Sequence, residues 1–245
     1  MELKGTLALV TGGARRVGRA IALELGAAGA DIAIHYGRSQ AEAESTIADL
    51  ADHGVEARPV QADLSNLESA ASLPDRVADA FGRPANVLVN SASGFPTDSL
   101  ADATAESWRS AQTLSLGAPV FLTQAFARLL GDDPGAVVNI TDVRTATPYK
   151  THFSYIVAKG GLDAFTKAAA VALAPSIRVN AVALGVILPP PGEDEAFAAK
   201  LASRLPLQRV GGTDPVARAV RFLVEDDFVT GEIVRIDGGG HLIPA

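Results

Sequence analysis

Two side chains with the spacing of a proton-transfer pair stand in the second half of the chain. Tyr155 and Lys159 lie four residues apart in a segment, 154–159, that reads as part of a helix, so both should project from one face. A phenol with its ordinary pKa of about 10 is a poor acid–base catalyst at neutral pH, and a nearby ammonium lowers that pKa by favouring the phenolate. The pair predicts acid–base chemistry at Tyr155, although the same spacing also occurs by chance on helix surfaces.

A glycine-rich turn near the N-terminus has the form of a phosphate-binding loop. Residues 11–18 follow a short apolar run and lead directly into a helix-period pattern, where free backbone N–H groups meet the positive end of a helix. Gly12 and Gly13 would let the backbone approach a pyrophosphate, and Gly18 would let the helix pack closely on the strand. The strand–turn–helix setting indicates a dinucleotide site, with a plain tight turn as the alternative.

The end of the second apolar run indicates which dinucleotide is bound. NAD sites place an acidic residue there to hold the ribose 2′-hydroxyl, but residues 35–39 read His-Tyr-Gly-Arg-Ser, without a carboxylate. Arg38 and Ser39, with Arg16 from the first turn, could instead surround a 2′-phosphate, which guanidinium groups bind with fixed geometry. The prediction is therefore NADP(H). The alternative is that Ser39 only caps the next helix and both arginines are solvated.

The elements that must position these residues follow a simple alternation. Short β-branched apolar runs alternate with longer helix-period segments, which predicts one α/β domain over residues 1–245, a Rossmann-type doubly wound parallel sheet with helices on both faces. Continuously apolar strands suit a sheet whose two faces are both covered. Segments 39–42 and 65–68 have the capping-box pattern and are expected to begin helices. The six strand-like runs are 7–10, 32–34, 87–89, 137–140, 179–182 and 233–236.

Composition narrows the possible functions. The chain has 245 residues, 48% of them hydrophobic, and a net charge of −7, so it can bury a core but has no basic run suited to nucleic acid. It has no cysteine, and its four histidines show no ligand spacing, so no metal site is predicted. The N-terminus lacks a signal-peptide pattern and the helix-like apolar stretch 168–174 is too short to cross a membrane; a soluble, cytoplasmic protein is expected.

Several of these segments together resemble one family. Residues 11–18, the segment Asn90-Ser-Ala-Ser at 90–93, the Tyr155 and Lys159 pair, and Asp-Gly-Gly at 237–239 resemble a short-chain dehydrogenase/reductase, and the resemblance covers essentially the whole chain. It implies a catalytic acid/base role for Tyr155, a homotetramer, and a Lys159 that holds the nicotinamide ribose and tunes the tyrosine. The cofactor-binding residues that it implies are Gly12, Arg16, Val17, Gly18, His35, Tyr36, Arg38, Ser39, Asp63, Leu64, Asn90, Ala92, Ser93, Lys159 and Gly185.

Two of the implied cofactor residues have structural alternatives. The resemblance places Asp63 and Asn90 against the adenine side of the cofactor. Asp63 could equally be a turn residue at the end of a strand, and Asn90 could make a hydrogen bond between strands. Other positions depart from the family: Ser115 replaces a helix asparagine that helps to hold a water, and Leu184-Gly185 replaces the usual Pro-Gly. The segment 186–205 is expected to cover the site.

The departure at Asp142 bears on the substrate. The family usually has a serine or threonine thirteen positions before the catalytic tyrosine, where this chain has Asp142. A carboxylate would oppose the alkoxide that forms in ketone reduction, whereas a protonated carboxyl suits a C=N bond whose nitrogen must gain a proton, and burial can raise its pKa accordingly. With Arg16 in place of a glycine and the 35–39 segment, the chain is similar to pteridine reductases.

That similarity implies the remaining site residues. Phe95 falls where pteridine reductases place an aromatic ring over the pterin, with plain packing as the alternative, and Ser93 would bond the pterin or the cofactor. The expected activity is NADPH-dependent reduction of a pterin or dihydropterin, with Asp142, Tyr155 and Lys159 catalytic and a small molecule as the partner. Two other readings stay open: a reductase of 3-oxoacyl thioesters or other carbonyl compounds, and a non-catalytic NADP(H)-binding sensor.

Overall fold

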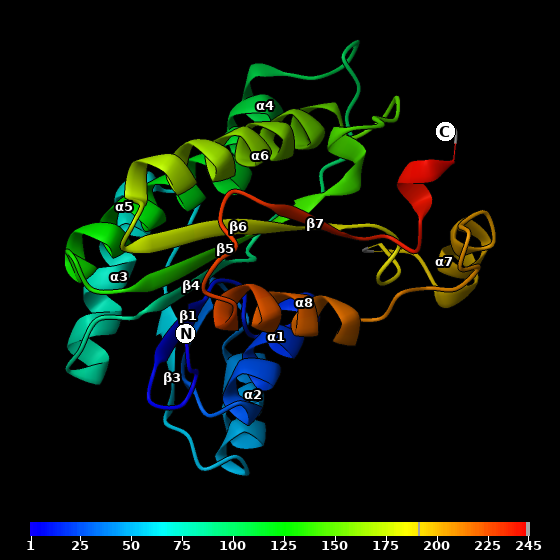
Figure 1. The fold of residues 1–245 in the computed structure, drawn as a ribbon. Helices are drawn as coiled ribbons and strands as arrows, with labels where there is room; N and C mark the ends of the chain where they lie inside the picture. The colour runs from blue at the N-terminus through cyan, green and yellow to red at the C-terminus, as the bar shows by residue number, and fades with distance from the viewer. Residues whose placement is uncertain (191, 244–245) are drawn as a thin grey trace.

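Seven parallel strands form one sheet in the order β3-β2-β1-β4-β5-β6-β7 (Figure 1). The structure is a computed structural model that describes residues 1–190 and 192–243. The strand order reverses between β1 and β4, and at such a point the carboxyl ends of parallel strands open a crevice for a ligand. The predicted doubly wound fold is confirmed. The strands are β1 (Leu7–Val10), β2 (Asp31–Tyr36), β3 (Ala57–Gln61), β4 (Val87–Asn90), β5 (Gly135–Asp142), β6 (Ile177–Leu184) and β7 (Ile233–Ile236).

Helices cover both faces of this sheet. Figure 1 shows α1, α2 and α8 on one face, α3, α5 and α6 on the other, and α7 beyond the carboxyl ends of the strands. A π-helical turn, η1 (Thr113–Gly117), joins α4 to α5, and a short 3-10 turn, η2 (Val143–Thr145), follows β5. The helices are α1 (Arg16–Ala27), α2 (Gln40–Ala51), α3 (Leu67–Phe81), α4 (Ala105–Gln112), α5 (Ala118–Leu130), α6 (Phe153–Leu173), α7 (Glu195–Ala202) and α8 (Asp214–Glu225).

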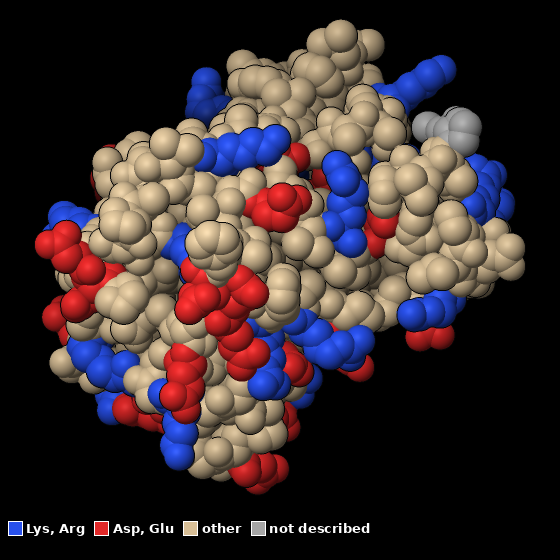
Figure 2. All heavy atoms as spheres, in the orientation of Figure 1, with Lys and Arg blue, Asp and Glu red and all other residues tan. Residues whose placement is uncertain are grey.

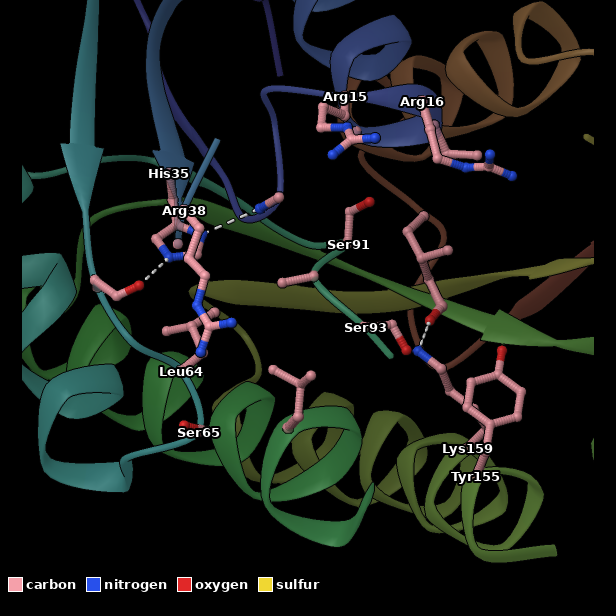
Figure 3. A pocket seen from close by; sticks show the side chains of 18 of the residues that line it. Arg15, Arg16, His35, Arg38, Leu64, Ser65, Ser91, Ser93, Tyr155 and Lys159 are labelled. Carbon is pink, nitrogen blue, oxygen red and sulfur yellow. Dashed lines mark hydrogen bonds between the residues drawn. The ribbon is translucent and has the colours of Figure 1, made fainter. Parts of the chain in front are cut away.

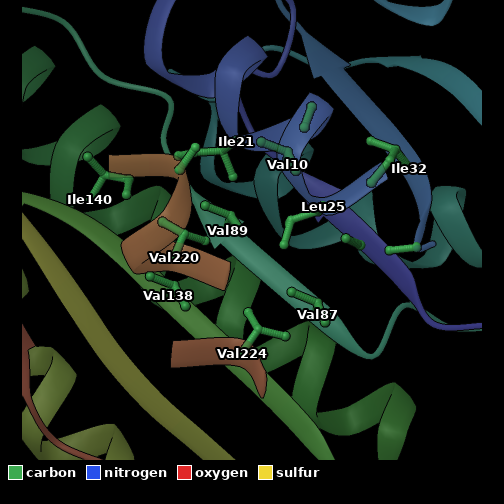
Figure 4. Packing of buried hydrophobic residues seen from close by; sticks show 14 of the residues in the cluster. Val10, Ile21, Leu25, Ile32, Val87, Val89, Val138, Ile140, Val220 and Val224 are labelled. Carbon is green, nitrogen blue, oxygen red and sulfur yellow. The ribbon is translucent and has the colours of Figure 1, made fainter. Parts of the chain in front are cut away.

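The core is divided by the sheet into two apolar clusters. Val138 of β5 packs in one cluster with Ile21 of α1 and Val220 of α8 (Figure 4). Its neighbour Val137 faces the other side and belongs to the cluster that contains Leu122 of α5. Both faces of β5 are therefore buried, which explains its continuously apolar sequence and fixes the position of the polar residues at its carboxyl end.

The six predicted strands are all present. The seventh, β3, was not predicted, and its composition explains why. β3 is an edge strand in which Arg58 and Pro59 are exposed and only Val60 is buried, so it has no apolar run. The predicted capping boxes do not form. Ser39 is the N-cap of α2 but makes no cap hydrogen bond, and α3 is capped by Asn66, which accepts a hydrogen bond from the Ser69 N–H.

The helical stretch Ala105–Leu130 is long and apolar enough to cross a membrane by length and composition alone, a feature that sequence analysis did not single out. In this fold, α5 packs against α3, and its side chains Leu122 and Phe126 are fully buried in the core. The apolar character of the stretch is accounted for by these contacts, because a helix buried between a sheet and its neighbours also becomes apolar on most sides.

Gly18, in the first turn of α1, marks a close contact that a larger residue should disrupt. A Cβ atom at Gly18 would lie 2.2 Å from the Gly12 carbonyl oxygen, whereas a Cβ at Gly160 in α6 would meet no atom within 4 Å. We expect Gly18→Ala to destabilise the protein by about 1–3 kcal/mol and lower its Tm by several degrees. Gly160→Ala, the control, should leave the Tm unchanged or raise it, since alanine favours helices. Equal Tm values for Gly18→Ala and wild type would refute the contact.

Candidate functional site

A cavity of about 660 Å³ lies along the carboxyl ends of the central strands, at the point where the strand order reverses (Figure 3). Its size suits a cofactor or a similar small molecule. Most predicted cofactor residues line it: Gly12, Arg16, Val17, Gly18, His35, Arg38, Asp63, Leu64, Ala92, Ser93 and Lys159, together with Tyr155. Residues that sequence analysis did not assign also line it, namely Arg15, Gly37, Ala62, Ser65, Ser91, Leu114, Ile140, Thr141 and Leu184.

The glycine turn is held in place by His35. The Gly12 N–H donates to His35 Nδ1 at 3.1 Å, so Nδ1 is the acceptor and Nε2 carries the proton toward the Ala62 carbonyl, also at 3.1 Å. Burial lowers the pKa of His35 to about 4. The neutral ring therefore joins the turn after β1 to the end of β3, and both of its nitrogens are already bonded. A contact of His35 with the cofactor, as predicted, would involve the ring rather than a positive charge.

The two arginines predicted to act together are separated. In Figure 3, Arg38 lies beside Leu64 and Ser65 at one end of the cavity, and Arg16 lines the cavity from the start of α1. Arg16 Nη2 donates to the Pro189 carbonyl at 2.6 Å, within the 186–205 segment. Both arginines line the cavity, and their expected role at a 2′-phosphate, with Ser39, stays a prediction. Residue Pro191 of the same segment lies outside the described residues.

The predicted catalytic residues come together where β5 ends and α6 begins. The Tyr155 hydroxyl donates to Asp142 Oδ2 at 3.1 Å, and Asp142 Oδ1 accepts from the Arg144 backbone N–H at 2.8 Å. Lys159, one turn farther along α6, is fully buried and donates from Nζ to the Ile140 carbonyl at 2.7 Å. An ammonium has three N–H donors, so two remain for the cavity that Lys159 lines.

The charges in this group differ from the sequence expectation in one respect. Burial raises the pKa of Asp142, and burial together with the charge of Asp142 raises the pKa of Tyr155 well above 10. The prediction that Lys159 lowers the pKa of the tyrosine is therefore wrong for this arrangement, because the carboxyl group contacts the phenol and Lys159 bonds to Ile140. Burial also lowers the pKa of Lys159 to about 8. Tyr155 is held as a neutral phenol, which is the proton-donating form.

An aromatic side chain borders the phenol on the open side. Phe95 meets the Tyr155 ring edge-on, with centroids 4.9 Å apart and planes at 83°. Nearby, the Ser93 and Ser115 hydroxyl oxygens are 3.2 Å apart. Ser115 is buried in the π-helical turn η1, where the family asparagine was expected. This places Phe95 next to the reacting groups, and its predicted role in substrate stacking stays a prediction.

Four predicted cofactor residues do not line the cavity. Asn90 is buried and donates from Nδ2 to Asn139 Oδ1 at 2.9 Å, which is the inter-strand hydrogen bond given above as its alternative. A Cβ at Gly185 would lie 2.6 Å from Asp237 Cα, so this glycine allows the ends of β6 and β7 to approach. Tyr36 packs against the apolar cluster of α1 and α8, and Ser39 serves as the N-cap of α2.

Asp63 is a turn residue that also lines the cavity. Its Oδ1 accepts hydrogen bonds from the Ser65 N–H at 2.9 Å and from the Ser65 hydroxyl at 2.6 Å, which forms the turn after β3. These bonds lower the pKa of Asp63. Because Asp63 also lines the cavity, a turn residue and a cofactor contact are compatible at this position.

Comparison with known proteins identifies the family. A family model described as "Enoyl-(Acyl carrier protein) reductase" matches residues 12–241, which is most of the chain. This chain is a short-chain dehydrogenase/reductase. A 3-oxoacyl-(acyl-carrier-protein) reductase from Synechocystis sp. is 35% identical to it over 97% of each chain.

Solved structures agree with this family. FolM alternative dihydrofolate reductase 1 from Brucella canis, complexed with NADP, is 37% identical to this short-chain dehydrogenase/reductase with a TM-score of 0.94, and the match covers 99% of this chain and 96% of that one. A short chain dehydrogenase from Burkholderia cenocepacia J2315 in complex with NADP is 34% identical with a TM-score of 0.90, covering 98% and 99% of the two chains.

The buried neutral His35 predicts how the stability of this short-chain dehydrogenase/reductase depends on pH. Its pKa is about 4 when folded and about 6.5 when unfolded, so the stability it contributes is present above pH 6.5 and is lost as the pH falls toward 4. The loss should reach about 3 kcal/mol. His35→Asn, which keeps an acceptor but cannot titrate, should be less stable at pH 8 and lose less between pH 7 and 5. Denaturant unfolding at pH 5, 7 and 8 tests this. An equal loss of unfolding free energy between pH 7 and pH 5 in the two proteins would count against it.

The lowered pKa of Lys159 predicts a loss of reductase activity in mild alkali. The ammonium is present below pH 8 and is lost above it, so kcat/KM should fall as the pH rises through about 8. Lys159→Arg keeps the charge and should move this fall to higher pH, although at a lower maximum rate. Lys159→Met should reduce the rate about 100-fold or more below pH 8, and the difference from wild type should narrow at higher pH. Rate profiles from pH 6 to 10 test this, and an unchanged alkaline limb in Lys159→Arg would assign it to another group.

Proposed function

We propose that this short-chain dehydrogenase/reductase is an NADPH-dependent reductase of the C=N bond of a pterin or dihydropterin. The observation that carries the proposal is the contact between the Tyr155 hydroxyl and Asp142 Oδ2 at 3.1 Å, in surroundings that raise the pKa of the carboxyl group. A neutral carboxyl group donates a proton where the usual serine or threonine would only donate a hydrogen bond. The nitrogen of a C=N substrate would then have Asp142 as its proton donor, whereas a carbonyl oxygen needs only hydrogen bonds from hydroxyl groups.

The cavity fits NADP(H). Gly12 has φ of 64° and Gly18 leaves no space for a Cβ, so the turn after β1 brings backbone N–H groups to the start of α1, where a pyrophosphate binds. No carboxylate side chain follows β2, and Arg38 lines the cavity at that point, which favours a 2′-phosphate over a free hydroxyl. The solved relatives from Brucella canis and Burkholderia cenocepacia hold NADP.

The chain's own residues then have defined tasks. When bound, NADPH supplies the hydride that reduces the carbon of the C=N bond. Asp142 gives a proton to the nitrogen, so that one C–H and one N–H bond form and the double bond becomes single. The Tyr155 hydroxyl, bonded to the carboxyl group, passes a proton to Asp142 or donates it directly. Lys159 holds the cofactor ribose with its remaining N–H donors while its bond to Ile140 keeps it in place. Orientation of the reacting atoms supplies much of the rate.

A pterin is favoured over other C=N compounds by the side chains around the phenol. Phe95 offers a flat apolar surface beside Tyr155, as a fused heterocycle requires, and stacking of this kind contributes about 0.5–1.5 kcal/mol beyond burial. The similar protein from Brucella canis carries the name of an alternative dihydrofolate reductase, an enzyme of reduced pterin chemistry.

Reduction of a 3-oxoacyl thioester or another carbonyl compound is the second candidate. It is favoured by the Synechocystis relative, which is named a 3-oxoacyl-(acyl-carrier-protein) reductase. The neutral Tyr155 and buried Lys159 would serve a carbonyl substrate equally well. Asp142 is the residue that separates the two candidates, because an ionised carboxylate beside a developing alkoxide raises the barrier.

A homotetramer in the cytoplasm stays part of the proposal. Charged side chains gather around α1, α2 and α3 in Figure 2, while the surface over α6 and β7 is mostly uncharged. Large apolar side chains are exposed on the helices and the loop that follows α8: Val171 of α6, Phe222 of α8 and Phe228. Exposed apolar residues of this size are typical of surfaces that pack against another subunit.

Substitution of Asp142 tests the choice between the two candidates. Asp142→Ser should lower NADPH oxidation with dihydrobiopterin or dihydrofolate about 100-fold, because the proton donor is lost, and should raise it with an acetoacetyl thioester. Asp142→Asn, of the same size, should lose pterin reduction without that gain. Steady-state NADPH oxidation with the three substrates is the measurement, and NADPH binding by fluorescence, expected to be unchanged, is the control.

Three results would change the proposal. Undiminished pterin reduction by Asp142→Ser would remove the proton-donor role. A wild-type enzyme that reduces the thioester, does not reduce pterins and does not bind methotrexate would favour the carbonyl candidate. If none of the three substrates gave NADPH oxidation, the non-catalytic sensor would be favoured.

A further inference from the structure

His152 lies directly behind the aromatic side chain of the site. Its imidazole stacks on the Phe95 ring with centroids 3.9 Å apart and planes at 28°, while the Phe95 and Tyr155 rings form a T-shaped pair with centroids 4.9 Å apart. Sequence analysis considered His152 only as a metal ligand and gave it no function. The contact connects the residue immediately before α6 with the loop after β4, which carries Phe95.

The backbone at His152 is in an unusual conformation. With φ of 60° and ψ of 34° it lies in the left-handed region, which residues other than glycine seldom adopt and which costs about 1–3 kcal/mol. His152 is also the N-cap of α6 but makes no side-chain cap hydrogen bond. The strained conformation therefore does not serve to cap the helix.

Asp98 caps the helix instead and fixes the same loop. Its Oδ1 accepts from the Ser154 N–H at 3.1 Å, and its Oδ2 accepts from the Ser154 hydroxyl at 2.5 Å. The Asp98 carbonyl also accepts from the Phe153 N–H at 3.2 Å. Because Asp98 caps α6, the His152 side chain is not needed as a cap, and it stacks on Phe95 instead.

The neighbours of His152 hold the ring at that place. Its Nδ1 lies 3.0 Å from the Thr151 hydroxyl oxygen, and the Tyr149 ring lies on another side with centroids 5.9 Å apart. His152 stacks on Phe95, and the Tyr155 ring lies close to Phe95 with its plane nearly perpendicular. A Phe95 ring without this support could tilt away from the phenol by rotating about its side-chain bonds.

We propose that His152 is a positioning and specificity-determining residue: its imidazole supports the Phe95 ring by stacking on it, so that Phe95 can hold a planar heterocycle beside Tyr155 and Asp142. This inference rests on the proposed function, because it assigns Phe95 to a planar substrate. His152 touches neither Asp142 nor the Tyr155 hydroxyl in the hydrogen bonds of the site, so its effect is on binding more than on proton transfer.

Two substitutions separate the ring from the backbone. His152→Asn keeps a residue that tolerates the left-handed conformation but removes the stacked ring, and His152→Phe keeps a ring of similar shape without its nitrogens. We expect His152→Asn to raise the KM for dihydrobiopterin about two- to tenfold, with kcat changed less than twofold, since a lost stacking contact is of that size. His152→Phe should restore the KM to within about twofold of wild type.

A second readout tests specificity. In His152→Asn the orientation of the Phe95 ring would no longer be fixed. The ratio of kcat/KM for dihydrobiopterin to kcat/KM for an acetoacetyl thioester should therefore fall about fivefold, because the thioester is not planar and does not depend on this ring. The affinity for NADPH, measured by fluorescence, and the Tm serve as controls. The affinity for NADPH should stay close to the wild-type value in both variants, whereas the Tm of His152→Phe should fall, since a bulky side chain is strained in the left-handed conformation.

The outcomes are distinct. An unchanged KM in His152→Asn, or a KM that rises equally in His152→Phe, would overturn the inference and leave the proposed function intact. A fall in kcat with an unchanged KM would also overturn it, because it would show that His152 acts on the chemical step. A wild-type enzyme that does not reduce pterins would instead overturn the proposed function, and the inference with it.

Discussion

The hydrogen bond from Lys159 Nζ to the Ile140 carbonyl, 2.7 Å long and fully buried, is the contact on which the site depends. It ties the first turns of α6 to the last residues of β5, the strand whose two faces are covered by the two halves of the core. Because β5 is fixed by packing, α6 is fixed with it. Asp142, two residues after the bonded carbonyl, and Tyr155, four residues before the lysine, are thereby brought into hydrogen-bonding distance.

This arrangement places three titratable groups in one poorly solvated region, where loss of water is the largest influence on the pKa of each. Desolvation raises the pKa of Asp142 and Tyr155 and lowers that of Lys159. All three shifts favour neutral forms, as expected for groups removed from water. The raised pKa of Asp142 and of Tyr155 favours the proton-donating form of each group, and reduction is a direction in which the substrate must gain a proton.

The sequence was sufficient for the fold and for the members of the site that belong to local patterns. The strand–turn–helix pattern at 11–18 and the i, i+4 spacing of Tyr155 and Lys159 each depend on a few adjacent residues, and both are found as expected. Edge strand β3 was absent from the predicted set because an exposed edge does not need apolar residues. The hydrogen bond from Arg16 to the Pro189 carbonyl could not be predicted, because it depends on where a long side chain turns and joins two distant segments.

Other members of the site have no sequence signal at all. Ile140 contributes a backbone carbonyl, so any residue could stand there, and the stack of His152 on Phe95 joins two loops that are far apart in the chain. The sign of the Tyr155 pKa shift was missed for a related reason. Spacing along a helix shows that Lys159 is near, but not that its ammonium is bonded elsewhere while a carboxyl group from β5 contacts the phenol.

Asp142 shows how one residue type can redirect a shared scaffold. This aspartate, at the end of β5, stands where the family usually has a serine or threonine. A hydroxyl stabilises an oxyanion by hydrogen bonding, whereas a carboxyl group does so only when protonated, and when protonated it is also acidic enough to transfer its proton to nitrogen. The chemistry therefore depends on how far burial keeps the carboxyl group neutral. The walls of the site that exclude water, Phe95 and the residues behind it included, thus contribute to the choice of substrate as well as to its binding.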